Sequence, residues 1–197
     1  SRFVGDVFGA PLAVEGLLAF FLESTFLGLW IFGRGRLSDR LHTACIWAVH
    51  VGTLFSAYFI LAANSFMQHP VGYVYNEQTG RAELTDFGKV LTQNTAVTAF
   101  FHTMTSGFLT AGALVAGVSA WLLTKGKAIE VARPTMKLGM ITTLVAGLLV
   151  FISGDAQARV MTTQQPMKMA AAEAQYATTD HASFSVFTLG TPDGSRP

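Results

Sequence analysis

A long apolar run near the start of the chain constrains the fold more than any other feature. It extends from Gly9 to Gly33, reads GAPLAVEGLLAFFLESTFLGLWIFG and contains no lysine or arginine. At 1.5 Å per residue, a helix of this length rises about 37 Å, more than the roughly 30 Å hydrocarbon core of a bilayer. The run therefore predicts a membrane-spanning helix, whose backbone polar groups are all satisfied within the helix.

Two glutamates, Glu15 and Glu23, interrupt this run. A charged side chain at the centre of a span costs roughly 2.5 to 3.5 kcal/mol, so such residues face the interior of a helix bundle and usually serve a function. In a regular α-helix, eight residues correspond to about 12 Å of rise and about 80° of rotation. We therefore expect both carboxylates on one side of a bundle, where charge or protons could pass along that face.

The composition agrees with a membrane setting. Only 13% of the residues are charged and 51% are hydrophobic, whereas ordinary globular domains contain about 25% charged residues. The net charge is +1 and no basic tract is present, which excludes nucleic acid as a partner. The single cysteine, Cys45, excludes an internal disulfide framework and a Cys-rich metal site, and its apolar neighbours predict a small buried hydrophobe.

Hydropathy predicts an all-α fold, a polytopic transmembrane helix bundle with four spans. The expected spans cover residues 9–33, 41–64, 96–124 and 135–153. Basic residues cluster in the two short connections, after the first span and around the start of the fourth: Arg34, Arg36, Arg40, Lys125, Lys127, Arg133 and Lys137. By the positive-inside rule these connections are cytoplasmic, so the long loop 65–95 and everything after Asp155 are expected outside. The chain thus divides into a transmembrane part, 1–155, and an extracytoplasmic part, 156–197.

This orientation places His102 about two turns below the outer end of the third span, at the same depth as Glu15. Small residues that let another helix or a flat cofactor approach the backbone follow it: Ser106, Gly107, Thr110, Ala111, Gly112, Ala113 and Gly117. A histidine facing such a surface is suited to be an axial ligand of haem iron. It is equally suited to hydrogen bond a neighbouring helix, and the residues alone leave both interpretations open.

The other histidines are weaker candidates. His50 in the second span is also intramembrane and is the second candidate for a ligand, whereas His42 lies one turn from the cytoplasmic edge, where its ring can snorkel. His69 and His181 fall in outer loops and are expected to be solvated.

A run of strong helix formers, 167–176, follows Pro166 on the outer side. Its charges, Lys168 and Glu173, are five residues apart and about 140° apart around a helix, so they are not expected to pair directly. A cation and an acid at the membrane edge suit a ligand with carbonyl or hydroxyl groups that exchanges protons. The alternative is a solvated surface helix. Asp155 is predicted to be a charge at the end of the fourth span that reaches water.

Four segments together closely resemble subunit I of cytochrome bd-type quinol oxidases. They are GAPLAVEGLLAFFLESTFLGLWIFG, ILAANSFMQHPVG, FFHT, and GD followed by QQPMKMAAAEA. The resemblance covers nearly the whole chain in the right order, and the first and last motifs are long enough to be specific. It implies a fragment of a multi-pass subunit of the bacterial cytoplasmic membrane, in which 156–197 is the first part of an extracytoplasmic segment called the Q-loop.

For the haems, the resemblance implies that His102 is an axial ligand of the low-spin haem b. It also implies that Glu15 is a ligand or close neighbour of haem d, the oxygen-reducing centre. The remaining ligands, including those of the high-spin haem b, are expected outside this stretch of chain. The residue at the position of His50 is typically small and apolar in the family, which makes His50 a weaker candidate for a haem ligand.

For protons and quinol, the resemblance implies that Glu23 and Ser24 belong to a proton route from the cytoplasm. Lys168 and Glu173 correspond to residues implicated in quinol oxidation, and Asp155 to the acid of the GD pair, which we group with them. The implied activity is quinol oxidation coupled to reduction of O2 to water, with proton-motive force generated by charge separation without pumping.

The implied partners are quinol, O2, membrane lipid, a second large oxidase subunit, small accessory subunits and the remainder of subunit I. The sequence does not discriminate ubiquinol from menaquinol. Two other classes fit intramembrane acids and a histidine: a proton-coupled transporter, which usually shows internal repeats that this chain lacks, and a non-catalytic structural subunit.

Overall fold

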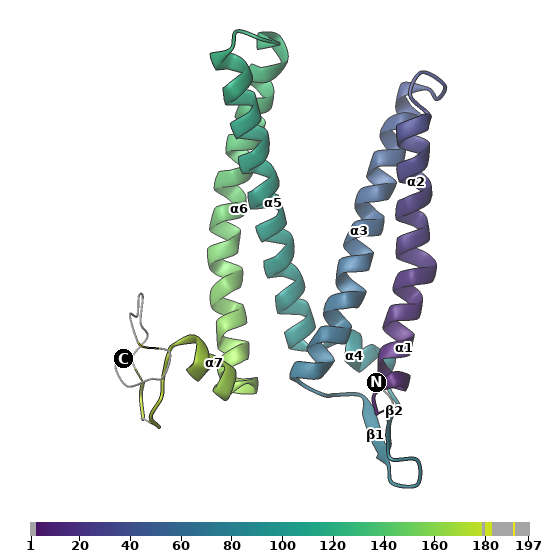
Figure 1. Cartoon of the computed structure of the whole chain (residues 1–197), viewed down its shortest axis with the longest axis vertical. Helices are drawn as coiled ribbons and strands as arrows, with labels where there is room; N and C mark the ends of the chain where they lie inside the picture. The colour runs from purple at the N-terminus through teal and green to yellow at the C-terminus, as the bar shows by residue number, and fades with distance from the viewer. Residues whose placement is uncertain (1–2, 179, 183–190, 192–197) are drawn as a thin grey trace.

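Four long helical rods dominate the computed structural model, which describes residues 3–178, 180–182 and 191 (Figure 1). The first rod is continuous through three segments: α1 (Gly5–Val14), the π-helical η1 (Glu15–Phe20) and α2 (Phe21–Phe32). The other rods are α3 (Asp39–Gln68), α5 (Asn94–Thr124) and α6 (Ile129–Gln164). Each rod is long and apolar enough to cross a membrane, which confirms the four predicted spans.

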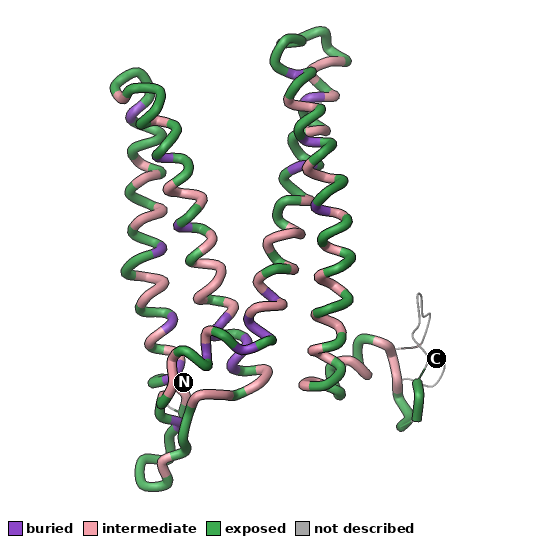
Figure 2. Tube along the Cα trace, turned by 180° about the vertical axis from the view of Figure 1, so that it is seen from behind, coloured by how far each residue is buried: buried purple, intermediate pink, exposed green. Residues whose placement is uncertain are grey.

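The rods form two antiparallel pairs, the first rod with α3 and α5 with α6 (Figure 1). The pairs meet at the end where α3 passes to α5, and they diverge toward the opposite end. Only 6–11% of the most apolar window of each rod is buried within the chain, and most positions along the rods are exposed or intermediate (Figure 2). Many of the exposed side chains are large and apolar. A surface of this kind is suited to contact with hydrocarbon or with further protein, since exposure of apolar side chains to water is unfavourable.

Capping residues explain where several helices begin and end. The Ser38 hydroxyl accepts a hydrogen bond from the backbone N–H of Leu41 at the start of α3. Gly126, with φ +65°, follows the end of α5 in the left-handed conformation that terminates many helices. The short helix α7 (Pro166–Ala172) begins with a proline, as its missing N–H and fixed φ favour.

The α5–α6 pair is closely packed through small residues. A Cβ atom on Gly139 of α6 would lie 2.6 Å from the backbone nitrogen of Ala116, and one on Gly112 of α5 would lie 2.8 Å from the Thr143 hydroxyl. Gly112 and Ala116 are four residues apart, as are Gly139 and Thr143, which is the spacing by which membrane helices bring their backbones together. At Gly112, the small surface expected on the third span therefore receives a helix.

The long loop expected at 65–95 is structured. It contains an antiparallel hairpin, β1 (Tyr73–Asn76) and β2 (Arg81–Leu84), in which Tyr73 pairs with Leu84. The short helix α4 (Phe87–Thr92) follows it and is capped by Asp86, whose side chain accepts from the Lys89 N–H at 2.9 Å.

This end of the molecule also holds a small buried cluster, formed by Val7, Phe66, Ala82 and Val90. Two hydrogen bonds attach the hairpin to the start of the first rod: the Ala82 N–H donates to the Phe3 carbonyl, and the Leu84 N–H donates to the Asp6 carboxylate, both at 2.9 Å. The hairpin therefore packs on the base of the first pair rather than projecting as an isolated loop.

The ends of the last helices differ from expectation. The fourth span, expected at 135–153, is the middle of a helix that runs from Ile129 to Gln164, so the boundary expected at residue 155 falls inside α6. Asp155 is exposed as expected but does not end a helix, and its carboxylate pairs with Arg159 at 2.9 Å. The helix expected at 167–176 ends at Ala172, because Ala174 takes a left-handed backbone with φ 54°. Cys45 is buried, as predicted.

Candidate functional site

Glu15 is the first residue of the π-helical segment η1 and faces α3. Its Oε1 accepts a hydrogen bond of 2.8 Å from the Ser56 hydroxyl, and the pair is partly buried. π-Helical turns within α-helices occur frequently at functional sites. The segment therefore adds independent support to Glu15 as a site residue, a signal that hydropathy does not carry.

Glu23 also lies against α3. A Cβ atom on Gly52 would come within 3.2 Å of the Glu23 backbone nitrogen and of its Cβ, so the absence of a side chain at Gly52 lets the two helices approach there. Gly52 and Ser56 are one helical turn apart on α3, which places both acids on the same face of the first pair, as expected.

The π-helical segment explains this common face. A π-helical turn holds one residue more than an α-helical turn. If η1 absorbs one residue, seven α-helical steps of about 100° separate Glu15 from Glu23, which is about 20° short of two full turns. The two carboxylates are therefore closer to alignment than the 80° of a regular helix. Ser24, next to Glu23, is exposed, and its hydroxyl donates to the Phe21 carbonyl at 3.4 Å within its own helix.

His102 on α5 faces α6. Its Nδ1 lies 3.1 Å from the Ser153 hydroxyl, and a Cβ atom on Gly154 would lie 3.4 Å from its Cε1. The Nδ1–Cε1 edge of the ring is therefore toward α6, whereas Nε2 forms no hydrogen bond with any residue that the structure describes. The second interpretation of this histidine, a hydrogen bond to a neighbouring helix, is thus realised at one nitrogen, and the other retains the capacity to bind iron.

Two ring contacts show that Glu15 and His102 lie at one level. Tyr58 packs on Phe100 with centroids 5.1 Å apart, and His50 packs on Phe108 with centroids 6.0 Å apart. Tyr58 and His50 are eight residues apart on α3, and Phe100 and Phe108 are eight residues apart on α5. The two helices therefore run antiparallel with matching positions along their lengths. Ser56, which holds Glu15, is therefore level with His102, although one faces the first rod and the other faces α6.

The remaining histidines differ in their contacts and in their exposure. His50 packs edge-on against Trp47 and Phe108, with centroids 5.9 and 6.0 Å away. His42 donates from Nε2 to the Trp30 carbonyl at 2.9 Å and so satisfies a carbonyl in the last turn of α2, a more specific role than the snorkelling expected of it. His69 is half-buried just after α3, and His181 is exposed.

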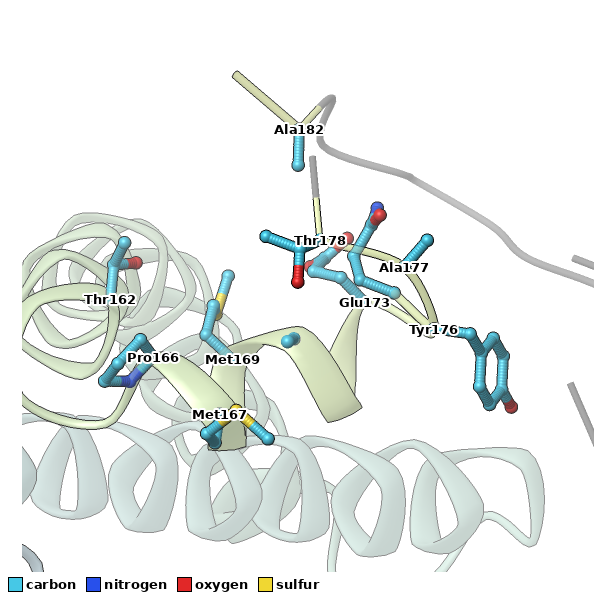
Figure 3. A pocket seen from close by; sticks show the side chains of 11 residues that line it. Thr162, Pro166, Met167, Met169, Glu173, Tyr176, Ala177, Thr178 and Ala182 are labelled. Carbon is cyan, nitrogen blue, oxygen red and sulfur yellow. The ribbon is translucent and has the colours of Figure 1, made fainter. Parts of the chain in front are cut away.

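Lys168 and Glu173 point to different surroundings, as their spacing predicts. The Lys168 ammonium donates to the Gln68 side-chain oxygen at 3.1 Å, and the Gln165 amide donates to the Gln68 carbonyl, so α7 is joined to the end of α3. Glu173 instead lines a hollow of about 640 Å³ between α7 and the chain that follows it, together with Met169 (Figure 3).

The described residues contain no group of three or more His, Cys, Asp or Glu side chains placed to hold a metal ion. The structure brings Glu15 and Glu23 to one helix face, and it keeps His102 and the Lys168–Glu173 region apart from them.

The sequence analysis missed several polar residues in contact with the candidate residues, among them Ser56, Ser153 and Gln68. Each lies within or at the end of an apolar span, where a polar side chain needs a partner. That requirement was the available signal, but the sequence does not say which helix supplies the partner.

Known proteins resemble the chain along its whole length. A family model described as cytochrome bd terminal oxidase subunit I matches residues 1–196. The chain is 51% identical, over 88% of its length, to cytochrome bd ubiquinol oxidase subunit 1 of Bacillus subtilis, and 39% identical, over 90%, to cytochrome bd-II ubiquinol oxidase subunit 1 of Escherichia coli. It covers 36% and 35% of these relatives, respectively.

A solved structure gives the same result for the fold. The bd oxidase from Geobacillus thermodenitrificans superposes on the whole chain with a TM-score of 0.85 at 27% identity, and the chain covers 45% of that protein. The chain therefore spans between a third and a half of the length of the relatives it matches.

Proposed function

This chain belongs to the cytochrome bd terminal oxidase subunit I family, and from that membership we propose that it acts in a terminal oxidase that oxidises quinol and reduces O2 to water. With its four spans, it is a bacterial membrane protein. Two quinols, each losing two protons and two electrons, supply the four electrons that convert one O2 to two water molecules. The proposed partners are quinol, O2, membrane lipid, a second large subunit, small accessory subunits and the remainder of subunit I.

The observation that carries this proposal is the arrangement of His102. Its Nδ1 lies 3.1 Å from Ser153, and its Nε2 has no partner among the described residues. An imidazole fixed at one nitrogen and open at the other fits an axial haem ligand, because metal-bound histidines almost always donate their second ring N–H to a neighbour. His102 would hold the low-spin haem b and Glu15 would lie at haem d. These haems, with the high-spin haem b, would supply electron transfer and oxygen reduction.

Glu15, Glu23 and Ser24 are assigned to the supply of protons. Glu23 would accept protons arriving from the cytoplasmic side, with the Ser24 hydroxyl beside it. The shared face toward α3 would let them continue to Glu15, whose carboxylate is held by Ser56. Taking these protons from the cytoplasm, while quinol releases its own outside, separates charge without a pump.

Lys168, Glu173 and Asp155 are assigned to the quinol side. The Glu173 carboxylate, which lines the hollow beside α7, would accept a proton from a quinol hydroxyl. The Lys168 ammonium would donate a hydrogen bond to a quinol oxygen after exchanging its contact with Gln68. Asp155, exposed on α6 and paired with Arg159, would receive released protons on the way to the outer solvent. The Q-loop is proposed to lie on the outer face of the cytoplasmic membrane.

The test is a dithionite-reduced minus air-oxidised absorption spectrum of the full-length protein in its complex, purified in mild detergent, beside a His102→Ala variant. We expect the variant to lose the low-spin haem b band and to keep the haem d band. His50→Ala is the matched control, because it also removes an intramembrane imidazole, and it should leave both bands unchanged.

Two results would contradict the proposal. A parent protein without haem bands would return the chain to the transporter or structural-subunit interpretations. Bands that survive His102→Ala but are lost in His50→Ala would keep the oxidase and move the ligand to His50.

A further inference from the structure

We propose that Ser153 of α6 is a positioning residue for His102: it accepts the Nδ1 hydrogen, fixes the ring tautomer and thereby sets the electron-donating strength of Nε2. The inference rests on the proposed function, in which Nε2 is the ligating atom. It concerns a residue outside the motifs that carry the family resemblance.

Three contacts surround the Ser153 hydroxyl. It lies 3.1 Å from Nδ1 of His102, 3.2 Å from the Thr105 hydroxyl and 3.3 Å from the Val150 carbonyl. His102 and Thr105 are one turn apart on α5, so both reach the same point of α6. The network is partly buried between two closely packed helices, where hydrogen bonds are stronger than in water.

We assign the tautomer by giving each hydroxyl hydrogen to a carbonyl of its own helix. The Thr105 hydroxyl has the carbonyls of Phe101 and His102, each 3.0 Å away, as acceptors for its one hydrogen. The Ser153 hydroxyl has the Val150 carbonyl in the same role. Carbonyls only accept, so this arrangement uses both hydroxyl hydrogens within the helices. Nδ1 then carries the ring hydrogen and donates it to Ser153, which leaves the lone pair on Nε2.

Gly154 shows how the ring lies on α6. A Cβ atom there would stand 3.4 Å from Cε1 and 3.7 Å from Nδ1 of His102, which are ordinary contact distances. The edge of the ring therefore lies against α6 at Gly154, while Ser153 next to it fixes the ring's rotation.

A hydrogen bond from Nδ1–H raises the basicity of the opposite nitrogen. A more basic ligand favours the oxidised form of the bound iron, so hydrogen bonding around the axial ligand adjusts the reduction potential. Removing the acceptor should therefore favour the reduced form. One neutral hydrogen bond is worth about 1 kcal/mol, and a difference of that size between the oxidised and reduced states corresponds to a change of about fivefold in the equilibrium constant for reduction.

The test is a redox titration of the low-spin haem b band in the full-length complex carrying Ser153→Ala. We expect the equilibrium to shift about fivefold toward the reduced haem. Ser153→Thr retains the hydroxyl and should restore the parent value. Ser106→Ala is the matched control, because that hydroxyl donates to the His102 carbonyl at 2.8 Å without touching the ring, and it should leave the titration unchanged.

An unchanged titration in Ser153→Ala, or an equal shift in Ser106→Ala, would overturn the inference. If Ser153→Ala fails to assemble, Ser153→Cys replaces it: sulfur is a weaker acceptor, so a smaller shift in the same direction supports the inference and a parent value overturns it. Failure of the proposed function is read separately, because His102→Ala would then retain the low-spin band whatever Ser153 does.

Discussion

The two helix pairs differ in the residues that form their helix–helix contacts. In the α5–α6 pair, Gly112 and Gly139 bring the helix backbones into direct contact. In the first pair, the rod contains a π-helical segment and presents its two glutamates to α3, with Ser56 as a hydrogen-bond donor and Gly52 as the site of close approach. The α5–α6 pair thus meets in a glycine seam, and the first pair meets in an acidic seam.

This difference matches the proposed roles. A haem ligand must keep one orientation, and His102 lies on the pair whose backbones are locked together. Acids that exchange protons must be reached by other polar groups, and Glu15 and Glu23 lie on the pair whose first helix is locally widened. In the proposed function, the haem ligand and the proton-carrying acids are therefore placed on separate helix pairs.

The largest expected effect comes from breaking the glycine seam. Gly139→Leu would place a side chain where even a Cβ atom is 2.6 Å from the Ala116 nitrogen, so α5 and α6 must separate. We expect a loss of about 3 kcal/mol of stability, a lower thermal midpoint in detergent and loss of the low-spin haem b band. Gly117→Leu is the control, because no neighbouring residue that the structure describes lies within 4 Å of a Cβ at that position. Equal melting of the two variants would show that the close contact does not hold the pair.

The next effect should be confined to the acidic seam. Glu23→Gln keeps the shape of the side chain but removes its ability to carry a proton. We expect oxygen consumption to fall about a hundredfold, the lower range for loss of a proton-transferring group, while the low-spin haem b band stays intact. Glu130→Gln makes the same change at an exposed position in the first turn of α6 and should have no effect. Unchanged turnover in Glu23→Gln would remove Glu23 from the proton route.

The smallest effect should come from the residue that holds Glu15. Ser56→Ala removes the 2.8 Å hydrogen bond to the Glu15 carboxylate, a loss of about 1 kcal/mol, and should slow oxygen reduction about fivefold. Thr53→Val removes a hydroxyl of the same helix that donates only to the Val49 carbonyl, and it should leave the rate unchanged. A parent rate in Ser56→Ala, with an unaltered haem d band, would show that this hydrogen bond does not orient the acid.

Hydropathy was sufficient to find the four spans, because about 20 apolar residues in succession have few other structures available to them. It did not show where α6 ends, since the helix continues past Asp155 through polar residues that no glycine or proline interrupts until Pro166. Helical hydrogen bonds do not need an apolar environment, so the helix extends beyond the apolar residues. Glu15 and Glu23 both lie against α3, as expected, but the π-helical segment between them was not foreseen.

The partners of the candidate residues were harder to predict. His102 contacts Ser153 across 51 positions of sequence, and Lys168 contacts Gln68 across 100. Such contacts depend on which helices are neighbours and on their relative rotation, and neither is encoded in the periodicity of a single span. The hairpin at 73–84 was missed for a related reason: its strands are four residues each, and it is stabilised by packing on the first rod.

The hydrogen bond between Asp6 and Leu84 has a consequence for how the protein is made. It joins groups 78 positions apart, and the cluster beneath it is completed only by Val90. During synthesis the first two rods must therefore enter the bilayer before the base of the first one can acquire its native contacts. The docking of the hairpin requires that the two rods have inserted in opposite directions, since inversion of one rod alone would leave the two partners on opposite sides of the membrane.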